Sequence, residues 1–143
     1  MRAAMRPGDT FLLGADLLKP IDTLLRAYDD PLGVTAAFNR NLLVRVNREL
    51  GGNFDLNAFA HRAVWNAALS RIEMHLVSKG RQHVRIAAAG VDITLDDGET
   101  VWTESSYKYR VSQVDGMLQA ADLHPEGQWI DPAGQFALTL ARA

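Results

Sequence analysis

The sequence predicts an α/β protein in which an N-terminal strand and a C-terminal helix–strand–strand unit enclose a mixed α+β insert. Residues 10–13 are apolar on both faces, which suits a strand inside a parallel sheet. Apolar residues recur at helical spacing over 111–121, and two strand-like segments follow. Between these outer parts, residues 72–109 alternate as antiparallel strands do.

Composition places the chain among ordinary globular proteins. Its 143 residues suit one domain, 48% are hydrophobic and 22% charged. The net charge of -2 and the absence of a basic cluster point away from nucleic-acid and membrane partners. Cysteine is absent, which excludes disulfides, thiolate metal sites and thiol nucleophiles. No membrane span or secretory signal is recognisable, so we expect a cytoplasmic protein.

The first half is predicted to be mainly helical after the opening strand. A turn over 6–9 precedes that strand, and residues 14–16 close it. Pro20 suits the first turn of a helix that runs to about Tyr28. Thr35 is expected to cap a second helix that runs to Leu50 and buries the stripe of residues 38, 42, 46 and 50. Gly51-Gly52 should end this helix, and a short helix could cover 55–60.

The second half is predicted to be mainly β-structure. About four strands, near 72–77, 84–86, 91–95 and 101–109, should form one antiparallel meander. A helix over 111–121 and strands over 123–130 and 135–140, around a turn at 131–134, complete the chain. A strand followed by a helix and two strands is also how many class I methyltransferase folds end, which is an analogy of fold alone.

The decamer Val101–Arg110 carries the clearest candidate site. Side chains alternate along a strand, so Glu104 and Ser106 are expected to point the same way, flanked by Trp102. A carboxylate beside a hydroxyl can hold a small ligand that has two hydrogen-bonding nitrogens. The alternative, a solvated strand face without a ligand, stays open at this point.

Other chemistries find little support. Of the four histidines, His75 and His83 could face each other across the Lys79-Gly80 turn, but no third metal ligand is evident. Solvated strand histidines are therefore the favoured interpretation, and no metal site is predicted. No serine lies in a nucleophile elbow, and no glycine-rich loop opens a helix to bind phosphate.

Nine short motifs together resemble one family, in its order and over essentially the whole chain. The motifs are Arg6–Asp9, Leu13–Lys19, Ala27–Asp30, Gly33–Ala36, Phe38–Asn41, Asn47–Gly51, Ile72–Met74, Thr103–Tyr109 and Asp131–Gly134. The family they resemble is the histidine-specific, S-adenosylmethionine-dependent methyltransferases, which include the L-histidine Nα-methyltransferases of ergothioneine biosynthesis.

The resemblance implies a substrate site. Glu104 and Ser106 are similar to the pair that holds the substrate imidazole, and Met74 to the apolar contact beside the ring. Tyr28 resembles the tyrosine that binds the substrate carboxylate. Thr35 and Phe38 resemble pocket residues near the amine and the ring.

The resemblance also implies how the chain is organised. It covers only the C-terminal part of a family member, with residues 1–18 and 110–143 as the last strands and helix of the class I (Rossmann-like) core. Residues 19–109 would be the substrate-binding insert. The family uses S-adenosylmethionine, but we expect this chain alone not to bind it, because no glycine-rich cofactor loop or acidic ribose ligand is recognisable.

The expected partner is L-histidine or a related amino acid, with self-association or an N-terminal complement as further possibilities. The alternative is a truncated, non-catalytic domain of the same fold that binds an amino acid or another protein. No catalytic residue is predicted within the chain itself.

Overall fold

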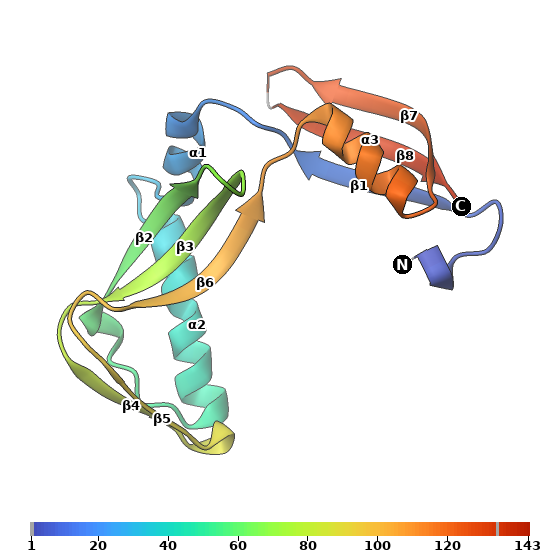
Figure 1. The fold of residues 1–143 in the computed structure, drawn as a ribbon. Coiled ribbons are helices and arrows are strands. Elements are labelled where there is room, and N and C mark those ends of the chain that lie inside the picture. Colours follow the sequence, from blue (N-terminus) through green and yellow to red (C-terminus); the bar gives the residue numbers. More distant parts are fainter. Residues whose placement is uncertain (1, 134) are drawn as a thin grey trace. The chain divides into compact units, whose positions relative to one another are not determined.

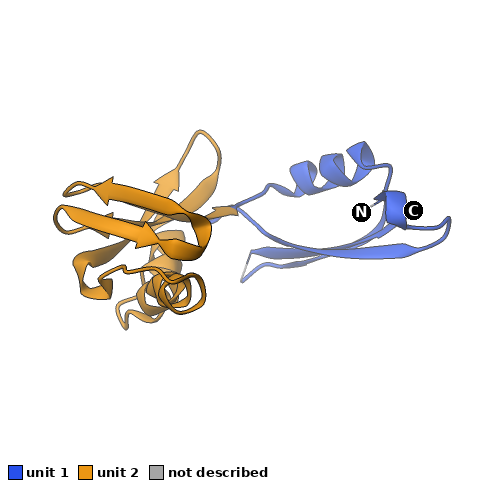
Figure 2. Cartoon of the chain, turned by 90° about the horizontal axis from the view of Figure 1, so that it is seen from below, with its two compact units in different colours: residues 1–20, 107–143 blue, residues 21–106 orange. Residues whose placement is uncertain are grey.

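The chain folds as a mixed α/β protein with antiparallel sheets, which confirms the predicted class at that level. The structure is a computed structural model that describes residues 2–133 and 135–143. Gly134, the last residue of the predicted turn at 131–134, therefore lies outside the described residues. The chain divides into two compact units, one of residues 1–20 with 107–143 and one of residues 21–106 (Figure 2).

The first unit is a three-stranded antiparallel sheet with one helix, in the strand order β1-β8-β7 (Figure 1). Its elements are η1 (Arg2–Ala4), β1 (Thr10–Asp16), α3 (Val111–Ala120), β7 (His124–Asp131) and β8 (Phe136–Arg142). No helix among the described residues is long and apolar enough to cross a membrane.

The opening strand differs from its prediction in length and pairing. It continues to Asp16 and pairs antiparallel with β8, whereas we expected it to end at Leu13 and to suit a parallel sheet. Gly14, predicted to close the strand, lies inside it. The Phe136 ring covers Gly14 so closely that a Cβ there would come within 2.9 Å of it. Glycine at this position therefore lets the Phe136 ring pack against the strand and does not mark a turn.

Helix α3 covers one face of this sheet. A buried apolar cluster joins the helix and the sheet, formed by Ala15, Val114, Leu118, Leu123 and Ala141. Leu138 and Trp129 are directly paired across β7 and β8, and both are exposed, at 40% and 58%. Leu138 alternates with the buried Ala137 and Thr139 along β8, so the face of the sheet that α3 leaves open carries large apolar side chains.

A partly buried ion pair forms at Asp16, the last residue of β1. The Lys108 side chain is fully buried, and its Nζ lies 2.9 Å from an oxygen of the Asp16 carboxylate. Lys19 Nζ lies 2.6 Å from the other oxygen. Burial raises the pKa of Asp16, but the two ammonium groups lower it by more, so the pKa falls below its usual value. The ion pair therefore keeps Asp16 ionised.

The second unit combines two helices, a three-stranded sheet and a two-stranded ribbon. Its helical elements are α1 (Ile21–Tyr28), α2 (Val34–Leu50), η2 (Leu56–Ala58) and η3 (Ala87–Ala89). Its strands are β2 (Phe59–Asn66), β3 (Arg71–Ser78), β4 (Gln82–Ile86), β5 (Val91–Leu95) and β6 (Thr100–Tyr107), the last of which ends one residue into the other unit. Figure 1 shows α2 lying along the sheet β2-β3-β6.

The predicted single meander is wrong in its pairing. Strand β3 lies between β2 and β6, while β4 and β5 form a separate ribbon. Strand β2 has no counterpart among the predicted strands. Its residues do not alternate cleanly, and the turn that joins it to β3 contains neither glycine nor proline. Ser70 instead supplies the positive φ of 49° at that turn, which the sequence does not announce.

Helix α2 is capped differently from the prediction. Thr35 lies within the helix, and the Asp30 carboxylate accepts hydrogen bonds from the N–H groups of Val34 (3.0 Å) and Thr35 (2.8 Å). These bonds lower the pKa of Asp30 to about 2. Gly51 ends the helix with a φ of 64°, as predicted.

The buried stripe of α2 is also shifted by one residue over most of its length, although Val46 packs against the core as predicted. Phe38, Leu42 and Leu50 are 68%, 44% and 42% exposed, whereas Asn39 and Leu43 are buried. Leu43 packs in the core of the unit with Phe54, Phe59, Leu76, Val84 and Leu95. The apolar periodicity misplaced the stripe because one of its central positions is polar.

Candidate functional site

All six predicted site residues lie in the unit of residues 21–106. Four elements carry them, namely α1, α2, β3 and β6. Tyr28 is the last residue of α1, Thr35 and Phe38 lie in the first two turns of α2, Met74 is in β3, and Glu104 and Ser106 are in β6. The site can therefore be described without reference to the other unit.

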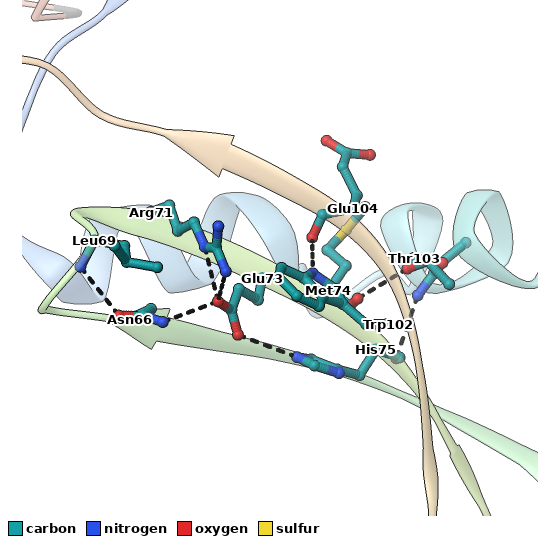
Figure 3. A network of polar contacts seen from close by, with 10 residues as sticks. Asn66, Leu69, Arg71, Glu73, Met74, His75, Trp102, Thr103 and Glu104 are labelled. Atoms are coloured by element: carbon teal, nitrogen blue, oxygen red, sulfur yellow. Dashed lines mark hydrogen bonds and ion pairs between the residues drawn. The ribbon is translucent and has the colours of Figure 1, made fainter.

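Three of the six residues line one small cavity. It has a volume of about 190 Å³ and lies among α2, β3 and β6. Its lining residues are Phe38, Asn39, Asn41, Leu42, Arg45, Met74, Thr103 and Glu104. Figure 3 shows the side chains of Glu104 and Met74 rising together from neighbouring strands. Cavities for drug-sized ligands measure about 300–1,000 Å³, so this one suits a smaller molecule.

The Glu104 side chain is the one carboxylate among the residues that line this cavity. Within residues 2–133 and 135–143, its carboxylate accepts no hydrogen bond and forms no ion pair; only its backbone oxygen is engaged, by Trp102 Nε1 at 2.9 Å. Glu104 is exposed at the rim, whereas Met74, at 3% exposed, forms the floor. The cavity thus presents a charged acceptor beside a soft apolar surface.

The two predicted hydroxyl ligands contact each other. Tyr28 Oη and Ser106 Oγ lie 2.6 Å apart, which joins the end of α1 to β6. Neither residue is among those that line the cavity. Thr35 also lies outside the lining, where its hydroxyl donates to the Ala27 carbonyl at 3.4 Å. The structure therefore brings together Phe38, Met74 and Glu104, and separately Tyr28 and Ser106.

Trp102 does not flank Glu104 as predicted. Its ring stacks on His75, with centroids 6.3 Å apart and planes 21° apart, and the Arg71 guanidinium lies 4.5 Å from its centroid. Arg71 and His75 alternate with Met74 along β3, so Trp102 lies on the sheet face opposite the cavity (Figure 3). Strict alternation would have placed residues 102 and 104 on one face.

A polar network occupies that opposite face. The Glu73 carboxylate accepts hydrogen bonds from Asn66 Nδ2 at 2.9 Å and Arg71 Nε at 2.8 Å (Figure 3). These two bonds lower the pKa of Glu73. His75 Nε2 lies 3.5 Å from the same carboxylate. The network compensates the charge of Arg71, which is 8% exposed.

Of His75 and His83, only His83 is solvated as predicted. The His75 side chain is only 13% exposed, so it is not a solvated strand histidine. His83 lies on the β4–β5 ribbon, where its Nε2 is 2.9 Å from Asp92 and two-thirds of its side chain is exposed. Among the described residues no three histidine, aspartate or glutamate side chains are grouped to hold a metal ion.

Two residues that the sequence analysis did not select adjoin the site. Asn39 lines the cavity and is 3% exposed, and its Nδ2 lies 3.0 Å from His61 Nδ1. The available signal was an asparagine between Phe38 and Arg40 in a predicted helix, a pattern that is ambiguous without the partner strand. His61 was in β2, which the sequence analysis did not predict.

Helices pack against an antiparallel sheet, which makes this an α/β protein, and a small cavity beside the sheet is lined by the Glu104 carboxylate, which has no hydrogen-bond or ion-pair partner among the described residues. The family model described as histidine-specific methyltransferase, SAM-dependent, matches residues 1–143. The chain therefore belongs to the family of histidine-specific, S-adenosylmethionine-dependent methyltransferases, which confirms the resemblance drawn from its motifs.

Curated relatives agree with this assignment. The chain is 52% identical over 141 residues to a histidine N-alpha-methyltransferase of Mycobacterium tuberculosis, covering 99% of this chain and 44% of that protein. It is 51% identical over 137 residues to the enzyme of that name from Mycolicibacterium smegmatis, covering 96% and 43%. An L-tryptophan methyltransferase of Psilocybe serbica is 33% identical over 141 residues, covering 95% and 38%. The chain spans less than half the length of these relatives.

Proposed function

We propose that this chain is the substrate-binding part of an S-adenosylmethionine-dependent histidine Nα-methyltransferase. In this proposal, residues 19–109 form the insert that binds the amino acid. Residues 1–18 and 110–143 are the last strands and helix of a class I (Rossmann-like) methyltransferase core. The names of the relatives that are 51% and 52% identical support the substrate. The family resemblance further implies a place in ergothioneine biosynthesis, which is part of the proposal.

The observation that carries the proposal is the unpartnered Glu104 carboxylate beside Met74 and Phe38. An imidazole N–H can donate a charge-assisted hydrogen bond to this carboxylate. The Met74 thioether and the Phe38 ring offer apolar contacts for the faces of a small aromatic ring. Because the Glu104 carboxylate has no hydrogen-bond or ion-pair partner in the part of the chain that the structure describes, it can bind a ligand without breaking such a bond.

The Tyr28–Ser106 contact limits how the two hydroxyls can serve the substrate. The pair holds two hydroxyl hydrogens, one of which lies between the oxygens 2.6 Å apart. If Tyr28 donates to the substrate carboxylate while Ser106 donates to Tyr28, Ser106 faces the imidazole as an acceptor. If Tyr28 donates to Ser106 instead, the Ser106 hydroxyl can donate to a ring nitrogen. The hydroxyl pair therefore links recognition of the carboxylate to recognition of the ring.

Positioning is the contribution that these residues would make to methyl transfer. The reaction needs the amine nitrogen in line with the methyl donor, and holding reactants in that geometry supplies a large part of such catalysis. Contacts at the ring, from Glu104 and Ser106, and at the carboxylate, from Tyr28, would fix the amine between them. No general base is assigned to this chain.

S-adenosylmethionine would supply the methyl group when it is bound, but the residues of this chain do not fit its site. A class I cofactor loop is glycine-rich and follows a strand. Here β1 leads into Leu17 and Leu18, and its one glycine, Gly14, lies beneath the Phe136 ring. We therefore propose that this chain alone does not hold the cofactor.

A second candidate substrate is tryptophan, because one relative that is 33% identical is named an L-tryptophan methyltransferase. An indole has one N–H, which could donate to Glu104 but leaves no ring nitrogen for Ser106. Histidine offers two ring nitrogens and a smaller ring for a cavity of about 190 Å³. These differences favour histidine. A non-catalytic amino-acid-binding domain would use the same contacts.

A titration monitored by NMR tests the proposal. The ¹⁵N-labelled chain is titrated with L-histidine, L-tryptophan and, as a control for the amino-acid backbone alone, L-alanine. We expect L-histidine to shift the amide signals of Met74, Glu104 and Ser106 at lower concentration than L-tryptophan does. L-alanine should leave these signals in place. Equal shifts with all three amino acids, or none with L-histidine, would contradict the proposal.

A further inference from the structure

We infer that Asn39 and His61 are positioning residues, which form a hydrogen-bonded relay of fixed direction that holds Tyr28 in place for the substrate. This inference rests on the proposed function, because it gives the relay a role in histidine binding. The relay connects four elements, since Tyr28 ends α1, Asn39 lies in α2, His61 lies in β2 and His75 lies in β3.

The relay is continuous. His61 Nε2 lies 2.8 Å from the Tyr28 carbonyl oxygen, and His61 Nδ1 lies 3.0 Å from Asn39 Nδ2. Asn39 Nδ2 lies 3.3 Å from the His75 carbonyl oxygen on β3. Asn39 is 3% exposed, so water does not replace these contacts readily.

The two ends of the relay set its direction. Both are backbone carbonyls, which only accept hydrogen bonds. His61 must therefore donate from Nε2 to the Tyr28 oxygen. Asn39 must turn its NH₂ group inward, with one hydrogen to the His75 oxygen and the other to His61 Nδ1. Every group is satisfied in one state only, in which His61 is neutral and carries its hydrogen on Nε2.

The relay acts on the site through its first and last members. The carbonyl of Tyr28 belongs to the last turn of α1, where no helical N–H can reach it, so His61 satisfies it from outside. The ring of the same residue reaches Ser106 at 2.6 Å. At the other end, His75 adjoins Met74, and Asn39 itself lines the cavity. Loss of the relay should therefore move Tyr28 relative to the cavity wall.

Asn39→Asp is the most informative change, because it keeps the shape and replaces two donors by acceptors. A carboxylate oxygen would then face the His75 carbonyl, which leaves that contact unfavourable. The contact with His61 is restored only if His61 takes up a second proton, on Nδ1. The variant should thus alter both the protonation of His61 and the position of Tyr28. Asn57→Asp, on an exposed side chain of the same unit, is the matched control.

The first measurement is the ¹⁵N NMR spectrum of the histidine rings in the 143-residue chain at neutral pH. We expect His61 to show the neutral Nε2–H tautomer in the unaltered chain and in Asn57→Asp. In Asn39→Asp it should show the doubly protonated ring. A hydrogen on Nδ1 in the unaltered chain would overturn the inference, and this readout requires no variant to fold.

The second measurement is calorimetric titration with L-histidine. Asn39→Asp should weaken binding by about tenfold, as the loss of a buried hydrogen bond does. Asn57→Asp should not change it, and His61→Gln, whose amide can still donate to the Tyr28 carbonyl, should retain more affinity than His61→Phe. Equal affinities for the unaltered chain and Asn39→Asp would overturn the inference. An unaltered chain that shows the expected tautomer but binds no histidine would instead refute the proposed function, together with the relay's part in it.

Discussion

Glu104→Gln separates a role in binding from a role in folding. The carboxylate forms no hydrogen bond or ion pair in the described part of the chain, so the neutral amide should change the free energy of unfolding by less than about 0.5 kcal/mol. A charge-assisted hydrogen bond contributes about 1.5–3 kcal/mol. Glu104 is exposed at the rim, where water competes, so the lower end of about 1.5 kcal/mol applies, or roughly tenfold in Kd. Glu104→Ala, which removes the acceptor as well, should cost about 2–3 kcal/mol of histidine binding.

Calorimetric titration with L-histidine measures these losses, and thermal unfolding measures stability. Asp97→Asn is the matched control, because it removes the same charge from an exposed turn between β5 and β6. We expect Asp97→Asn to bind histidine as the unaltered chain does. The reasoning fails if Glu104→Gln binds histidine as tightly as Asp97→Asn, since Glu104 would then be a solvated strand residue. It fails equally if Glu104→Gln unfolds at a clearly lower temperature.

Four further predictions concern the rest of the chain. Ser106→Ala should lose about half as much histidine affinity as Glu104→Ala, because a hydroxyl contact is neutral, and the same titration checks this. The chain alone should show no calorimetric signal with S-adenosylmethionine, and micromolar affinity would contradict the cofactor proposal. Asp30, whose pKa is about 2 in the folded chain, should stabilise α2 fully above about pH 4 and lose this effect as the pH falls through about 2. The difference in unfolding free energy between the unaltered chain and Asp30→Asn should therefore shrink over that pH range. Because β1 pairs on one side only among the described strands, light scattering should show self-association that rises with concentration, and Leu12→Lys on this edge should reduce it.

Regular patterns made much of the fold predictable. The helix that ends at Gly51 and the strand pair β4–β5 each carry a clear period and a clear stop signal. Strand β2 lacks both. The turn between β2 and β3 contains neither glycine nor proline, and Ser70 adopts a positive φ there. Local sequence patterns also could not predict which strand pairs with β1. A strand that is apolar on both faces fits an antiparallel neighbour equally well when one face meets α3 and the other is left open.

The sequence predicted several residues of the candidate site, but it predicted less well which of them lie together and on which face of the sheet. Glu104, Met74 and Phe38 meet at one cavity, and Tyr28 meets Ser106, although α1 and β6 are far apart in sequence. Simple alternation failed between residues 102 and 104, since Trp102 Nε1 bonds to the Glu104 backbone oxygen and its ring stacks on the other face. A local backbone bond of this kind has no sequence signal.

Asn39 and Glu104 line the same cavity, but their side chains contribute differently to the stability of the fold. Burying an amide is unfavourable unless its donors are satisfied, and both hydrogens of Asn39 have acceptors, on His61 and on the His75 backbone. Its substitution therefore disturbs packing and ligand geometry together. The Glu104 side chain has no such partners within residues 2–133 and 135–143, so its charge does not stabilise this part of the fold through a hydrogen bond or ion pair. A charged group that does not stabilise the fold, placed beside buried residues of a cavity lining, is the arrangement expected of a binding site. A substitution of Glu104 therefore tests function more cleanly than a substitution of Asn39.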